Sequence, residues 1–123
     1  MKRIYLKSVI AGAAMLLSTT AANAAIPEHL YMVGPASPSL WVLDVAQEMT
    51  NEGEGVFSYV GNLYKGQLQF INEKNWDTGI RYVPEADGSW LTYAMDATII
   101  GEVNSNRFWW VPEFGTWEVK AFF

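Results

Sequence analysis

From residue 30 onward, the chain is divided into short runs of apolar or alternating residues, each closed by turn residues. Turn signals that recur roughly every 8–12 residues are typical of an antiparallel β-sandwich. No pattern for a long amphipathic helix competes with this arrangement. The sequence therefore predicts an all-β, antiparallel β-sandwich of about seven strands. We expect the strands at residues 30–34, 56–60, 67–71, 80–83, 98–103, 107–111 and 116–123, and residues 90–94 also suit a strand.

Alternation within the expected strands indicates which side chains face the core. Leu68 and Phe70 share the face that we expect to point inward. Trp109 and Trp110 are neighbours on one strand, so they point to opposite faces and one of them belongs to the core. Trp117 shares a face with the apolar residues of the last strand, which predicts a core position.

The connecting segments are interpreted from their turn residues. We interpret residues 40–50 as a loop with one helical turn, although Trp-Val-Leu within them also suits a strand. Residues 51–55 (NEGEG) predict a turn, and Gly61-Asn62 predicts the end of the strand before it. The last two expected strands flank residues 112–115 (PEFG), so we predict that they form a closing hairpin.

Residues 1–24 have the pattern of a secretory signal peptide. A basic start with Lys2, Arg3 and Lys7 precedes the apolar run SVIAGAAMLL, and the small-residue pattern Ala-Asn-Ala ends at Ala24. The apolar run is shorter than the about 20 residues that a membrane-spanning helix needs, so we predict no membrane span. Residues 25–123 are then expected to form a single domain in the periplasm, outside the cell or at the outer membrane.

Charge and composition exclude several classes of function. The predicted signal peptide holds three of the eight basic residues and none of the thirteen acidic ones, so residues 25–123 carry a net charge of −8. Nucleic acid is therefore not an expected partner, because phosphate binding requires clustered Lys and Arg. The chain has no cysteine and one histidine, His29, which excludes disulfides, thiolate metal sites and zinc sites with several imidazoles.

Six tryptophans in so small a chain exceed what a single core needs, so we expect some of these rings to serve a ligand. Trp76 lies in the polar segment Lys74-Asn75-Trp76-Asp77, where few apolar neighbours can bury it and where Lys and Asn supply hydrogen-bonding groups. Trp41 also lies in a segment with loop signals, between apolar residues that can draw it inward. Flat rings with polar neighbours suit sugars, whose C–H faces stack on indoles.

The acidic residues give no selective sign of catalysis. Glycoside hydrolysis requires two carboxyl groups about 5–10 Å apart across a cleft, and the sequence selects no such pair. The acidic residues are more simply a solvated surface. The chain also lacks a calcium-binding loop, a phosphate-binding loop and a nucleophile elbow. We therefore expect no enzyme activity, no catalytic residues, no cofactor and no metal site.

Several runs resemble a carbohydrate-binding module of the SusE/SusF family of outer-membrane starch-binding proteins. The matching runs are LYMVGPA (residues 30–36), Trp41, Met49-Thr50, VFSYVGNL (residues 56–63), GQLQFI (residues 66–71) and the closing segment 108–123. The resemblance covers nearly all of residues 25–123. It implies an immunoglobulin-like β-sandwich that binds an α-glucan such as starch without cleaving it.

The resemblance also implies candidate binding residues. Two tryptophans of the family correspond to Trp41 and Trp76, and the Lys of its Phe-Lys-Phe strand is replaced by Gln69. Lys74 and Arg81 can substitute for that lysine, and Asn75 adds a hydrogen-bonding group beside Trp76. Unlike the multi-domain lipoproteins of the family, this chain is one module without a cysteine that could accept a lipid.

Three hypotheses follow from these observations. The first is a non-catalytic protein that binds a polysaccharide, with an α-glucan as the expected partner. The second is a structural or protein-interaction domain that binds another envelope protein through exposed rings or edge strands. The third is a small hydrolase that uses two carboxyl groups. The positions of Trp41 and Trp76 distinguish the first hypothesis from the others.

Overall fold

The computed structural model of the protein describes residues 2–8, 14–19, 26–84, 99–102 and 107–123. The regular secondary structure of these residues is β-strand, apart from one short 3-10 helix. The strands are β1 (Lys2–Ser8), β2 (Ala14–Thr19), β3 (Tyr31–Val33), β4 (Gln47–Glu48), β5 (Thr50–Gly53), β6 (Val56–Leu63), β7 (Gly66–Ile71), β8 (Arg81–Pro84), β9 (Ile99–Glu102), β10 (Trp109–Val111) and β11 (Gly115–Phe122), and the 3-10 helix is η1 (Leu43–Val45).

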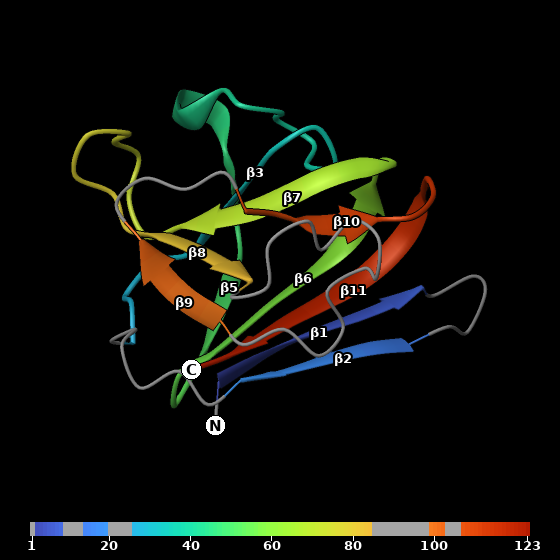
Figure 1. Cartoon of the computed structure of the whole chain (residues 1–123), viewed down its shortest axis with the longest axis horizontal. Coiled ribbons are helices and arrows are strands. Elements are labelled where there is room, and N and C mark those ends of the chain that lie inside the picture. Colours follow the sequence, from blue (N-terminus) through green and yellow to red (C-terminus); the bar gives the residue numbers. More distant parts are fainter. Residues whose placement is uncertain (1, 9–13, 20–25, 85–98, 103–106) are drawn as a thin grey trace.

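Two antiparallel sheets make up the fold (Figure 1). The first sheet has the strand order β2-β1-β11-β6-β5, and the second has the order β4-β3-β7-β8-β9. β10 also joins the second sheet, because it pairs with Gly66–Leu68 of β7 while β8 pairs with Phe70 and Ile71. The expected all-β antiparallel sandwich is confirmed. β1 and β2 lie within the predicted signal peptide, whose cleavage stays a prediction.

The inward faces of the two sheets meet in one core. The buried members of this core are Leu30, Met32, Ala36, Met49, Phe57, Leu63, Leu68, Phe70, Tyr82, Ile99, Trp109, Val111, Trp117, Val119 and Ala121. The inward positions predicted for Leu68, Phe70 and Trp117 are confirmed. Trp109 is the core member of its pair and contacts Phe70 edge to face at 5.4 Å between ring centroids, whereas Trp110 is half-buried on the opposite face.

The predicted closing hairpin is wrong. β10 pairs with β7 in the second sheet, and β11 pairs with β6 and β1 in the first. The turn between β10 and β11 therefore crosses from one sheet to the other, as does the turn between β6 and β7 beside it (Figure 1). Alternation cannot distinguish the two arrangements, because strands that face each other across a core have the same pattern as strands paired within one sheet.

Two other segments differ from the expectation. β6 does not end at Gly61 but continues to Leu63. The Tyr59 side chain lies over Gly61, so a Cβ at this position would overlap it, and the glycine allows this close approach rather than a turn. The segment expected as loop and turn contains β4 and β5 beside the expected helical turn, η1. The possible strand at residues 90–94 lies outside the described residues.

Candidate functional site

The outer face of the second sheet carries a second, smaller apolar cluster. Val33 of β3 and Ile71 of β7 point away from the main core and are covered by Leu43 and Ala46 from the segment around η1. Tyr31 and Trp76 pack against this cluster as partly buried members. The cluster gives two loops, residues 34–46 and 72–80, a common base on one face of the sandwich.

The first loop presents Trp41. Gly34 starts it with a φ of 112°, and its N–H donates to the Leu40 carbonyl at 2.8 Å. The buried Ser37 hydroxyl donates to the Gly34 carbonyl at 2.9 Å, with the Leu40 carbonyl as a second acceptor at 3.1 Å. Leu40 itself adopts the left-handed conformation, with a φ of 56°. These contacts fix the backbone of residues 34–40. Trp41 follows directly, and 40% of its surface is exposed.

The second loop presents Trp76. The side-chain oxygen of Asn75 accepts the N–H groups of Asp77 at 2.8 Å and Thr78 at 3.2 Å, an Asx-type turn. The Gly79 N–H donates to the Asn75 carbonyl at 2.8 Å and closes the turn. The side-chain oxygen of Asn75 is thus committed to the loop. Among the described residues its amide nitrogen has no hydrogen-bond partner, which leaves this donor for a ligand.

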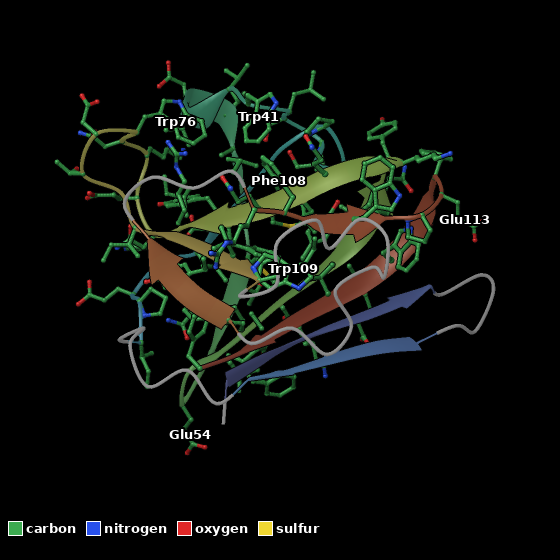
Figure 2. All side chains as sticks on the ribbon, viewed as in Figure 1. Trp41, Glu54, Trp76, Phe108, Trp109 and Glu113 are labelled. Atoms are coloured by element: carbon green, nitrogen blue, oxygen red, sulfur yellow. The ribbon has the colours of Figure 1, made fainter. Side chains whose placement is uncertain are left out.

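The two loops bring Trp41 and Trp76 together. Their ring centroids are 6.1 Å apart and their planes are inclined by 53° (Figure 2). The Arg81 guanidinium lies over the Trp76 ring at 4.8 Å from its centroid, a cation–π contact that fixes this ring. Phe108 contacts Trp41 edge to face at 5.8 Å. Each indole is therefore packed against the other and against one further side chain.

An open concavity of about 540 Å³ lies at this pair of rings. Its walls are Trp41, Val42, Leu43, Asp44, Lys74, Asn75, Trp76 and Asp77. The Lys74 ammonium connects the second loop to the first, because it donates to the backbone carbonyl of Asp44 at 3.3 Å. It also lies 5.3 Å from the centroid of the Tyr31 ring. The concavity thus combines indole faces with carboxylate, ammonium and amide groups, the composition of a site for a neutral ligand that has both apolar faces and hydroxyls.

Four of the six predicted residues line this concavity, namely Trp41, Lys74, Asn75 and Trp76. Arg81 contacts Trp76 but is not among the lining residues, so its place in the structure is that of a support. Gln69 is not brought to the site. Its side chain has no exposed surface, and its amide donates to the Arg107 carbonyl at 2.9 Å between β7 and the start of β10. A lysine ammonium would be poorly accommodated there, because burying a charge is costly.

Sequence reasoning missed three residues of this region. Asp77 lines the concavity next to Trp76, and its place directly after Trp76 in the sequence could have indicated this. Asp44 comes from η1, and its position depends on how the first loop folds back over Leu43. Phe108 reaches Trp41 only because β10 pairs with β7. Its contact therefore depends on the strand order that the predicted hairpin misassigned.

In the described part of the chain, no three His, Asp or Glu side chains gather in a way that could hold a metal ion. Among the same described residues, no helix is long and apolar enough to cross a bilayer.

Comparisons with known proteins leave the site to be interpreted from its geometry. No protein-family description matches the chain, and no curated protein or solved structure is significantly similar to it.

Proposed function

We propose that the protein is a non-catalytic polysaccharide-binding domain and that Trp41 and Trp76 form its sugar-stacking site. One observation carries the proposal. Two tryptophans from loops far apart in the sequence converge to 6.1 Å on one open concavity instead of entering the core. The polar wall of this concavity consists of Lys74, Asn75, Asp44 and Asp77, which supply both donors and acceptors to hydroxyl groups.

The inclination of the rings bears on the class of glycan. Coplanar rings suit a flat chain, whereas rings inclined by 53° suit a chain whose successive sugar faces turn. An α-glucan such as starch has such a curved chain, in agreement with the sequence resemblance to starch-binding modules. We therefore propose an α-glucan as the preferred ligand.

The surroundings of the two lining carboxylates favour binding over hydrolysis. Asp44 and Asp77 are both solvent-exposed. A general acid that protonates a glycosidic oxygen at neutral pH has its carboxyl group in apolar surroundings. Exposed carboxylates suit acceptors of sugar hydroxyl groups, so we assign them to binding.

Affinity electrophoresis tests this proposal. Native gels that contain amylopectin, pullulan, dextran or xylan would be compared with gels without polysaccharide, and we expect retardation in amylopectin and pullulan. Trp41→Ala and Trp76→Leu should lose most of this retardation, while the exposed Val60→Ala on the first sheet serves as the matched control. A chain retarded in none of the gels, or equally retarded after loss of both indoles, would refute the proposal and leave a protein-interaction domain of the envelope as the better hypothesis.

A further inference from the structure

We infer that the ligand site does not end at Trp41 and Trp76 but continues along β10 to a second aromatic pair, Tyr64 and Phe114, so that the protein binds an extended stretch of a polysaccharide chain. This inference rests on the proposed function and extends it. It assigns a second contact region and a minimum ligand length.

The outward face of β10 supplies the connection between the two pairs. Trp109 and Val111 are buried in the core, so Phe108 and Trp110 take the opposite face by alternation along the strand. The contact between Phe108 and Trp41 shows that this is the same face of the second sheet that bears the concavity (Figure 2). A line of rings therefore leads from Trp41 over Phe108 to Trp110.

The second pair lies where this line ends. Tyr64 occupies the turn from β6 to β7 and Phe114 the turn from β10 to β11, the two adjacent connections between the sheets. Their ring centroids are 5.1 Å apart and their planes are inclined by 38°. The rings are 46% and 60% exposed, so the two contacting side chains form one exposed aromatic patch.

The structure gives the two pairs a similar form. Each consists of two inclined rings from two separate loops, and each has polar neighbours, which are Lys65 and Glu113 at the second pair. Phe108 and Phe114 are six residues apart, which limits their separation to at most roughly 20 Å, because the chain turns between β10 and β11. The first pair lies beyond Phe108, so we expect contact with both pairs to require a longer oligosaccharide than the one that stacks on Trp41 and Trp76. Contact with both would raise affinity through effective concentration.

Titration calorimetry or tryptophan fluorescence with oligosaccharides of defined length tests the inference. The probes are maltotriose and maltoheptaose, with cellotriose and cellohexaose as the flat-chain series. Phe114→Ala and Tyr64→Ala remove exposed rings, and Trp110→Leu removes the connecting ring while keeping an apolar side chain. Val60→Ala, an exposed apolar residue of the first sheet, is the control. Circular dichroism would verify that each variant is folded.

The expected result for wild type is an affinity at least about tenfold higher for maltoheptaose than for maltotriose. Phe114→Ala and Tyr64→Ala should each lower the maltoheptaose affinity about fivefold and leave maltotriose binding unchanged, whereas Trp41→Ala should weaken both. Equal affinity for short and long oligosaccharides, or maltoheptaose binding that is unaffected by Phe114→Ala, Tyr64→Ala and Trp110→Leu, would overturn the extended site while the proposed function stands. Absence of binding to all four oligosaccharides would overturn both.

Discussion

Gly34→Ala should destabilise the protein through the backbone that positions Trp41, although residue 34 does not line the concavity. A Cβ on Gly34 would lie 2.5 Å from the carbonyl oxygen of Gln67 in β7, closer than any ordinary contact. That oxygen also accepts the N–H of Ala36 at 3.0 Å, and the Gly34 N–H donates to Leu40 at 2.8 Å. Making room for the methyl group therefore disturbs the hydrogen bond from Ala36 to β7 and the hydrogen bond from Gly34 to Leu40 within the first loop.

The magnitude can be compared with a matched glycine. Gly53 has a φ of 89°, close to the 112° of Gly34, but a Cβ there would meet no atom within 4 Å. Conformational strain in this region costs about 1–3 kcal/mol, and the lower entropy of the unfolded alanine chain offsets about 0.4–1 kcal/mol of it. Gly53→Ala should thus lose about 1 kcal/mol of stability. Gly34→Ala adds the overlap and two weakened hydrogen bonds, each about 1 kcal/mol, for a total loss of about 3–4 kcal/mol.

Urea unfolding followed by tryptophan fluorescence would measure both free energies of unfolding. We expect Gly34→Ala to lower the midpoint much further than Gly53→Ala, with similar slopes. Glycan binding by folded Gly34→Ala should also weaken, because the loop that carries Trp41 has shifted. Equal losses of stability in the two variants would refute the close approach of Gly34 to β7.

Three further predictions test other parts of the account. Asn75→Asp keeps the oxygen that accepts the Asp77 and Thr78 N–H groups but loses the amide donor. The free energy of unfolding should therefore change by less than about 0.5 kcal/mol, while glycan affinity in calorimetry falls about tenfold. A full loss of folding would contradict this division of roles. Leu40→Gly relieves a left-handed conformation at an exposed side chain, so urea unfolding should show a gain of up to about 1 kcal/mol, and a clear loss would argue against that backbone geometry. Burial raises the pKa of Tyr82, so the folded state holds the phenol proton more tightly than the unfolded chain. The free energy of unfolding should fall as the pH rises from about 10 toward the raised pKa of the folded state, and less steeply in Tyr82→Phe. Parallel alkaline profiles of the two proteins would contradict a raised pKa of Tyr82.

The sequence predicts the strands of this protein better than their partners. Alternation places Leu68, Phe70 and Trp117 in the core correctly, because an antiparallel strand that is buried on one face repeats every two residues. The same repeat leaves open whether β10 pairs with β11 or faces it from the other sheet. The misassigned hairpin follows from this ambiguity.

The candidate site shows the same division between local and tertiary information. Trp76 could be singled out because its immediate neighbours are polar, and Lys74 and Asn75 line the concavity with it. Gln69 could not be judged in this way, since its burial depends on Arg107 approaching β7 from a distant segment. The position of Asp44 at the site could not be predicted from the sequence either. Its contact with Lys74 of the second loop joins residues that are far apart in the sequence.

The proposed site requires that Trp41 and Trp76 contact a glycan together and that the buried Trp109 does not. Nuclear magnetic resonance of the ¹⁵N-labelled indole N–H groups, titrated with maltoheptaose and assigned with Trp41→Ala and Trp76→Leu, tests it most directly. We expect shifts of the Trp41 and Trp76 signals and no shift of the signal of Trp109, whose ring is fully buried in the core. Unmoved Trp41 and Trp76 signals at saturating maltoheptaose would contradict it.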